Sequence, residues 1–314
     1  FILTPNGYVA VYNDKGQFLW ELSIVPEEIS AQNNIYGGLA INKDKLAVTS
    51  SLGELLLISL SKRRVAWRYD FKRPFRSAPI FHKGYIFGIT GDDIAVSLDV
   101  NGKLRWTKKG PQKNTKVFAT VSPAALGNKV LFPFSGGSLV ALNAVSGIEE
   151  WEINLENSNI GSASASLGDF ASDPAVYGST IFGVGAFGET FSATKSGKVL
   201  WRNNIQSSSR LIVSGNSAFY SSNNSFIGRL NSKNGKIVFL KEFTGKKWVK
   251  YHGPLLLQNK LLVLATDKNA YWLSPEDGRL LKKEKLGKKV SSPPVVVNKR
   301  LIFVSEDGML NILN

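Results

Sequence analysis

Lys195-Ser-Gly-Lys-Val-Leu-Trp201 decides the fold, because its glycine and tryptophan, four residues apart, recur along the chain. Trp67 keeps the aromatic residue, with Arg63 where the glycine would stand. Seven such motif ends, 38 to 50 residues apart, indicate a repeat architecture such as a propeller. The other copies are Gly16–Trp20, Gly102–Trp106 and Gly147–Trp151, followed by the weaker Gly235–Phe239 and Gly278–Lys282.

The glycine and the aromatic residue of the motif have separate local tasks. A turn-forming polar residue precedes most of the glycines, as in Lys233-Asn-Gly235, and glycine supplies the positive φ that tight hairpins require. The strand that follows ends on a large aromatic side chain, which can cover the neighbouring repeat and give its N–H a partner. We therefore expect structural docking between repeats from Trp20, Trp67, Trp106, Trp151, Trp201 and Phe239.

Each repeat has the same internal order: a strand that opens at a proline, two further strands around a glycine-containing or polar turn, and the motif hairpin. A proline is tolerated at the first residue of a strand, where its missing N–H has no ladder partner. This order predicts an all-β fold with one domain over residues 1–314, an eight-bladed β-propeller of four-stranded antiparallel blades. The opening prolines are Pro79, Pro123, Pro174, Pro254 and Pro294, and the blades are expected at 1–24, 36–71, 77–109, 121–155, 172–205, 209–243, 252–286 and 291–314.

The first and last repeats are shorter than the others. The first begins without an opening strand, and the eighth stops after its third strand. Propellers commonly close by borrowing a strand from the other terminus, which hides the last sheet edge. We expect a closing segment upstream of Phe1 to complete the ring.

Composition excludes several functional classes. The chain has no cysteine, which rules out disulfides, thiolate catalysis and cysteine-based zinc sites. No run approaches about 18 uninterrupted apolar residues, so a membrane-spanning helix is not expected. The net charge of +15 suggests an acidic partner, nucleic acid or an anionic lipid surface, or else a general enrichment in lysine.

Motifs for chemistry are few, and we predict no catalytic residue, no metal site and no cofactor. The only histidines, His82 and His252, are distant in the sequence. The stretch from Gly183 to Gly188 fits the G-x-G-x-x-G dinucleotide pattern, but a strand follows it where a helix is needed. Turn carboxylates such as Asp92-Asp93 are expected to serve solubility.

Basic residues gather in the loops between blades. In a four-stranded blade these loops share one face of the ring with the turns between the second and third strands. The sequence therefore predicts one strongly positive face. Its cations are Lys72, Arg73, Arg76, Lys108, Lys109, Lys113, Lys116, Lys246, Lys247, Lys250, Lys288 and Lys289.

The repeats resemble those of the pyrroloquinoline-quinone-type (PQQ-like) propeller superfamily, and the order of units resembles the BamB family of outer-membrane assembly lipoproteins. The most telling match is Leu167-Gly-Asp-Phe-Ala-Ser-Asp-Pro174, similar to the family loop that enters the fifth blade. The resemblance implies a non-catalytic scaffold at the periplasmic face of the outer membrane, held by an N-terminal lipid anchor absent from this chain. It implies no nucleic-acid partner.

In the BamB family two adjacent loops dock the POTRA domains of BamA, the barrel-forming subunit, and nascent outer-membrane proteins are a further candidate partner. The first family loop carries Leu-x-Leu-Arg, which aligns here with Thr115-Lys-Val-Phe118 and lacks the arginine. The second carries two aspartates flanking one residue; this chain keeps Asp169 and has Ala171 for the second. The partner-binding residues that the resemblance implies are Thr115, Lys116, Val117, Phe118, Leu167, Asp169, Phe170 and Ala171.

A second hypothesis uses the central channel of the propeller. Quinoprotein dehydrogenases share the repeat, and a sugar- or polymer-binding propeller would also use this channel. The quinoproteins use a vicinal cysteine pair and a calcium ion, and this chain has no cysteine. The scaffold is therefore the favoured interpretation, with the enzyme or polymer-binding propeller as its alternative.

Overall fold

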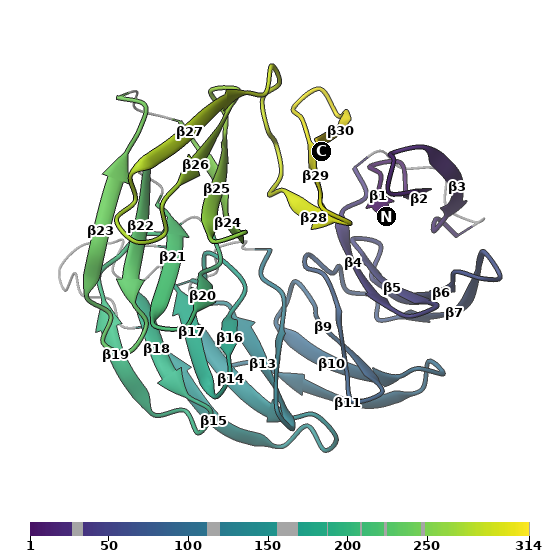
Figure 1. Cartoon of the computed structure of the whole chain (residues 1–314). Coiled ribbons are helices and arrows are strands. Elements are labelled where there is room, and N and C mark those ends of the chain that lie inside the picture. Colours follow the sequence, from purple (N-terminus) through teal and green to yellow (C-terminus); the bar gives the residue numbers. More distant parts are fainter. Residues whose placement is uncertain are drawn as a thin grey trace.

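The computed structural model describes residues 1–26, 34–111, 120–155, 169–186, 188–207, 209–222, 225–245 and 249–313. Within these ranges every regular element is a β-strand, and the strands form eight antiparallel sheets. The sheets are arranged around a central axis, with the two termini in neighbouring sheets (Figure 1). The predicted eight-bladed β-propeller is confirmed.

Six blades have four strands, whereas the first and the last have three among the described residues. The first lacks an innermost strand and the last lacks an outermost strand, in the order that the sequence indicates. The innermost strands are β4 (Gly37–Asn42), β8 (Ile80–His82), β12 (Ala124–Leu126), β16 (Ala175–Tyr177), β20 (Ile212–Ser214), β24 (Tyr251–Leu257) and β28 (Val295–Val297). The second strands are β1 (Ile2–Leu3), β5 (Lys45–Ser50), β9 (Tyr85–Ile89), β13 (Lys129–Phe134), β17 (Thr180–Val184), β21 (Ser217–Ser221), β25 (Lys260–Ala265) and β29 (Arg300–Val304).

The third and outermost strands are joined by the motif hairpins. The third strands are β2 (Tyr8–Tyr12), β6 (Glu54–Ser59), β10 (Ile94–Asp99), β14 (Ser138–Asn143), β18 (Thr190–Thr194), β22 (Phe226–Asn231), β26 (Asn269–Leu273) and β30 (Leu310–Leu313). The outermost strands are β3 (Phe18–Ser23), β7 (Arg64–Asp70), β11 (Leu104–Lys109), β15 (Glu149–Asn154), β19 (Val199–Asn203), β23 (Ile237–Glu242) and β27 (Leu280–Lys285).

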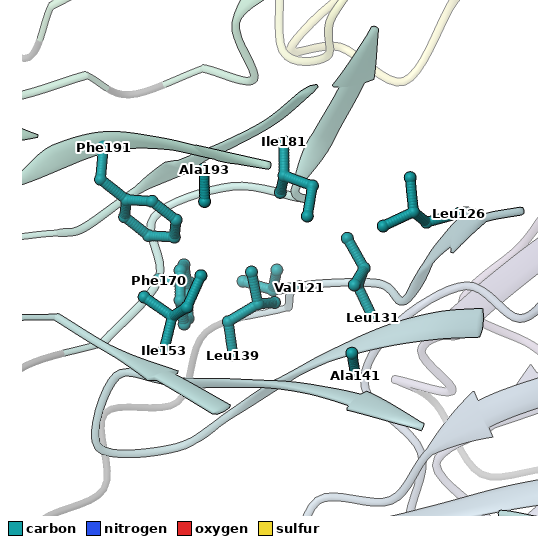
Figure 2. Close-up of a cluster of buried hydrophobic side chains, with 10 residues drawn as sticks. All are labelled: Val121, Leu126, Leu131, Leu139, Ala141, Ile153, Phe170, Ile181, Phe191 and Ala193. Carbon is teal, nitrogen blue, oxygen red and sulfur yellow. The ribbon is translucent and has the colours of Figure 1, made fainter. Parts of the chain in front are cut away.

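The hydrophobic core lies between blades rather than within one. In the second blade, the second and third strands are buried almost throughout, because neighbouring sheets cover both of their faces, whereas the outer strand β7 alternates between half-buried and exposed residues. Figure 2 shows one such interface, where Leu131 and Leu139 of the fourth blade face Ile181 and Phe191 of the fifth. Successive interfaces of this kind hold the ring together.

The motif glycine of one blade is seated on the motif aromatic residue of the blade before it. A Cβ atom added to Gly197 would lie 2.7 Å from the Cγ atom of Trp151, and Gly197 has a φ of +85°. Only glycine therefore meets both the turn and the close approach of the ring. The same seating joins Gly102 to Trp67, Gly147 to Trp106, Gly235 to Trp201 and Gly278 to Phe239.

Each indole N–H of these four tryptophans donates a hydrogen bond to a backbone carbonyl in the same hairpin of the next blade. Trp151 donates to Lys195 at 3.1 Å and Trp201 to Ser232 at 2.9 Å. The acceptors lie two or three residues before the seated glycine, so a single hairpin covers the ring face and satisfies the N–H. The remaining pairs are Trp67 with Val100 at 3.1 Å and Trp106 with Ala144 at 3.3 Å.

The first junction uses a variant of this contact. The guanidinium of Arg63 lies 5.9 Å from the centre of the Trp20 ring, and Arg63 takes a φ of +49° at the position of the missing glycine. At this junction the Arg63 side chain therefore covers the indole through a cation–π contact, whereas at the other junctions the glycine of the hairpin lies on the ring.

The last blade contacts the first through the motif hairpin of the first blade. A Cβ atom on Gly16 would lie 2.5 Å from the Cδ1 atom of Ile312 in β30. Arg300 forms an ion pair with Asp14 at 3.1 Å and also donates to its backbone carbonyl at 3.0 Å. The eight blades therefore form a complete circle of contacts.

Two features of the strands differ from the expectation. Pro254 lies inside β24 rather than at its start, at a register shift between His252 and Leu255, where a missing N–H is tolerated. In addition, every outermost strand carries a β-bulge against its third strand; in the third blade Arg105 is the extra residue between Trp106 and Leu104. The hydrophobic pattern of the sequence gives no sign of these bulges.

We expect Trp201→Ala to lower the free energy of unfolding by about 3–5 kcal/mol, because the indole is 8% exposed and its removal leaves a cavity and an unpaired carbonyl. Chemical denaturation followed by circular dichroism measures this loss. The neighbouring Leu200 is 47% exposed, so Leu200→Ala is the control and should cost less than about 1 kcal/mol. Equal losses in the two variants would contradict the docking role of the indole.

Candidate functional site

The connecting segments between blades lie on the same face of the ring as the turns between second and third strands. Isolated bridges join Phe75 to Thr90, Phe170 to Gly185 and Val290 to Ser305. Each bridge pairs a connecting segment with the second-to-third turn of the blade that it enters. We call this side the entrance face, and the side with the motif hairpins the hairpin face.

The entrance face is less positive than its basic residues suggest, because carboxylates of the adjacent turns pair with several of them. Arg73 pairs with Asp92, and the Lys288 ammonium donates to Asp307 at 2.6 Å. That hydrogen bond is the main cause that lowers the pKa of Asp307 to about 2. Four of the predicted cations, Lys113, Lys116, Lys246 and Lys247, lie outside the described residues.

Five of the sequence-predicted partner-binding residues also lie outside the described residues: Thr115, Lys116, Val117, Phe118 and Leu167. The structure describes the other three, Asp169, Phe170 and Ala171, at the end of the segment that enters the fifth blade. Asp169 is 3% exposed, and its carboxylate accepts a hydrogen bond from the Gly136 N–H at 3.0 Å. It thereby fastens this segment to the second-to-third turn of the fourth blade.

Phe170 and Ala171 are fixed within their own blade. The Phe170 ring is 1% exposed and meets Phe191 edge-on, with 6.5 Å between ring centres. In Figure 2 Phe170 lies in the same cluster as Val121, which ends the preceding segment. The Ala171 N–H donates to the Val184 carbonyl at 2.8 Å. Asp169, Phe170 and Ala171 are therefore held firmly in the ring at the end of this segment.

A direct hydrogen bond joins the ends of the two predicted loops. The Ser122 N–H donates to the Asp173 carboxylate at 2.7 Å. Burial raises the pKa of Asp173, while this hydrogen bond and the charge of Arg210 act in the opposite direction. Segments that are 51 residues apart in sequence thus share one base at the entrance to the fourth and fifth blades.

A further carboxylate, which the sequence did not reveal as a site residue, continues this base to the third blade. Asp93 is 7% exposed and accepts hydrogen bonds from the Ser135 N–H at 3.0 Å and from the Ser135 hydroxyl at 2.9 Å. The expectation that Asp92 and Asp93 both serve solubility is therefore wrong for Asp93. The positions of Ser122 and Asp173 could have been found from the sequence, because each directly precedes a proline that opens the innermost strand of a blade.

A cavity of about 340 Å³ lies where the innermost strands of the fifth to eighth blades begin. Its walls include Asp173, Arg210, Lys250, His252 and Pro254. His252 is 5% exposed, and burial is the main cause that lowers its pKa, so its imidazole is neutral at pH 7. The cavity has the volume and the few convergent polar groups of a small-molecule site.

Neither a metal cluster nor a membrane-spanning helix emerges from the described part of the chain. No three acidic, histidine or cysteine side chains within the described ranges converge to hold an ion. None of the described segments forms a helix with the length and apolarity needed to cross a bilayer.

Comparison with known proteins identifies a family, several related sequences and a similar crystal structure. A family model described as outer membrane protein assembly factor BamB matches residues 5–241. Similar proteins include BamB of Bordetella pertussis, 21% identical over 99% of this chain and 79% of the relative, and BamB of Legionella pneumophila, 29% identical over 62% and 51%. The crystal structure of BamB from Moraxella catarrhalis superposes with a TM-score of 0.85 at 18% identity, covering 98% of this chain and 91% of that one.

Propellers with another chemistry share the fold. A europium-containing methanol dehydrogenase superposes with a TM-score of 0.66 at 13% identity, over 88% of this chain and 76% of that one. At this identity the likeness shows the fold alone, so the site must be argued from its own residues.

Replacing Asp173 by Asn tests the shared base of the two loops. The raised pKa means that ionisation of this carboxyl is less favourable in the folded chain than in the unfolded one. The protonated carboxyl therefore favours the folded chain at low pH, and this contribution to stability is lost as pH rises through the folded pKa. Asn keeps an oxygen acceptor for Ser122 but carries no charge. We therefore expect the stability of Asp173→Asn relative to the unmodified chain to increase between about pH 3 and pH 7.

Urea unfolding over this pH range measures the difference. Asp277 is the matched control, because the Ser274 hydroxyl is the main cause that lowers its pKa and the pH dependence of Asp277→Asn should have the opposite sign. A pH-independent difference for Asp173→Asn would show that burial does not destabilise this carboxylate.

Proposed function

Because the chain belongs to the family of the outer membrane protein assembly factor BamB, we propose that it is a non-catalytic scaffold of the machinery that assembles β-barrel proteins in the outer membrane. The matched region, residues 5–241, includes the second to fifth blades, most of the first and sixth, and both candidate loops. The confirmed propeller supports this role, since its loops offer a broad docking face on a rigid ring.

The proposed partner is BamA, which docks through its POTRA domains at the entrance face between the fourth and fifth blades. The observation that carries this proposal is the hydrogen bond between Ser122 and Asp173, which brings the ends of the two loops to one base. A base held by buried contacts reduces the conformational entropy that a partner must remove on binding.

Within this proposal the predicted site residues have two different roles. Residues 115–118 and Leu167 are the contact residues, with Val117 and Phe118 as the apolar anchor and Lys116 in place of the family's arginine. Asp169, Phe170 and Ala171 act as positioning residues, since their side chains or backbone are engaged inside the ring. An apolar centre with a polar rim is the usual form of a binding hot spot.

The proposal places the chain at the periplasmic face of the outer membrane, held there by a lipid anchor outside this sequence. Nascent outer-membrane proteins are the second proposed partner. The alternative function, a small ligand or substrate bound in the channel, is supported by the 340 Å³ cavity beside His252. It has less support as quinoprotein chemistry, because the chain has no cysteine pair to place against a quinone.

Replacing both Val117 and Phe118 by Ser should weaken binding of a BamA POTRA fragment by about 30-fold, which corresponds to the loss of a hot spot of about 2 kcal/mol. The thermal unfolding temperature should stay unchanged, because these side chains are proposed to face the partner. Isothermal titration calorimetry and differential scanning fluorimetry measure the two quantities.

Two further variants complete this experiment. Ile148 is 67% exposed on the hairpin face, so Ile148→Ser is the control and should leave affinity unchanged. Asp169→Ala should lower both affinity and thermal stability, since it removes an acceptor from a buried N–H. Unaltered affinity in the double Ser variant would remove residues 115–118 from the proposed site.

The absence of catalysis is tested on the purified chain. We expect no quinone absorbance, no bound calcium after dialysis and no dye-linked oxidation of alcohols or sugars. Calcium needs an assembled cage of oxygen ligands rather than scattered turn carboxylates. One equivalent of calcium, or oxidation that depends on added quinone, would favour the enzyme instead.

A further inference from the structure

The outermost strands of the sixth and seventh blades carry exposed aliphatic side chains. On β23, Ile237, Val238 and Leu240 are 51%, 49% and 44% exposed. On β27, Leu280 and Leu281 are 46% and 43% exposed. Apolar side chains that gather in this way on a surface commonly mark an interaction site.

The two strands lie next to each other on the circumference of the ring. Gly278, which begins the hairpin of the seventh blade, is seated on Phe239 of β23. Arg229 of the sixth blade donates to the backbone carbonyls of Pro275 and Glu276 in the same hairpin at 3.1 and 2.9 Å. Figure 1 shows β23 and β27 as the outer strands of neighbouring blades. Their exposed sides therefore form one continuous rim.

Lysines follow the aliphatic side chains along both strands of this rim. Lys241, Lys282, Lys283 and Lys285 are all exposed, against two glutamates in the same strands, Glu242 and Glu284. Glu284 pairs with Lys282 and also accepts the Trp272 indole N–H at 2.7 Å. The rim therefore has a positive balance around a partly apolar surface.

Other blades show that the repeat itself does not require lysines there. The outer strand β15 carries Glu149, Glu150 and Glu152 and no basic residue. The outer strand β3 exposes Phe18 and Leu19 at 54% and 52%, with Glu21 as its only charged side chain. Lysine often protects a sheet edge from pairing, but glutamate does so equally in β15. The outer strand β11 is also basic, with Arg105, Lys108 and Lys109, but it exposes no aliphatic side chain. The combination of exposed aliphatic side chains with lysines is therefore what distinguishes β23 and β27.

We propose that the rim formed by β23 and β27 binds an anionic lipid surface. Aliphatic side chains can enter the interfacial region of a bilayer while lysine stems extend so that their ammonium groups reach the lipid phosphates. A nucleic acid would be recognised by phosphate contacts and aromatic stacking rather than by exposed leucine and valine. The +15 net charge adds long-range attraction to a negative membrane.

This surface is separate from the proposed docking site. The rim lies on the outer circumference of the sixth and seventh blades, whereas the docking loops leave the entrance face at the fourth and fifth. Lipid and protein partners can therefore bind together, and neither proposal depends on the other.

Vesicle co-sedimentation of the full chain tests the rim directly. The chain should partition onto vesicles of phosphatidylcholine with phosphatidylglycerol and only weakly onto phosphatidylcholine alone. Replacing Lys282, Lys283 and Lys285 by Gln should lower the partition coefficient by about fivefold for each lysine. Val238→Ser with Leu281→Ser should also lower it, because the apolar contribution is lost.

Two matched controls separate the rim from general charge and general hydrophobicity. Replacing the exposed Lys83, Lys103 and Lys195 by Gln removes the same charge from other blades and should leave most of the binding intact. Phe18→Ser with Leu19→Ser removes more exposed apolar surface elsewhere and should change nothing. Equal loss in the rim and control lysine variants, or no preference for phosphatidylglycerol, would overturn the proposal.

Discussion

The contact between a motif glycine and the aromatic ring of the preceding blade determines most of this structure. The glycine turns with a positive φ and leaves room for the ring, and a carbonyl of the same hairpin takes the indole N–H. Each blade is thereby held to its neighbour at the circumference, while buried aliphatic side chains join the same two sheets further inward. Stability in such a ring accumulates from contacts between neighbours.

This arrangement leaves the entrance face available for function. The hairpin face is engaged in joining blades, whereas the connecting segments of the entrance face need only reach the next innermost strand. The carboxylates of Asp169 and Asp173 fasten two of these segments to backbone N–H groups of the adjacent blade or segment. The carboxylate of Asp93 joins the second-to-third turns of the third and fourth blades in the same way. A rigid base below variable loops is the usual setting for a binding site.

The parts of the fold that depend on local chemistry could be predicted from the sequence. Glycine turns, opening prolines and motif aromatics revealed the repeat, the number of blades and the order of strands. The brace at Asp93 could not be predicted, because Asp93 and Ser135 are 42 residues apart and a turn aspartate resembles a solvated one. The bulge at Arg105 leaves no mark in the hydrophobic pattern. For the site, the sequence located the loops but did not reveal that Asp169 is buried.

Hydrogen–deuterium exchange of the chain with and without a BamA POTRA fragment tests the central claim most directly. The account predicts protection of residues 109–122 and 156–173, with unchanged exchange in the motif hairpins at Gly102, Gly147 and Gly197. Protection of those hairpins, with the two entrance loops exchanging as in the unbound chain, would contradict it.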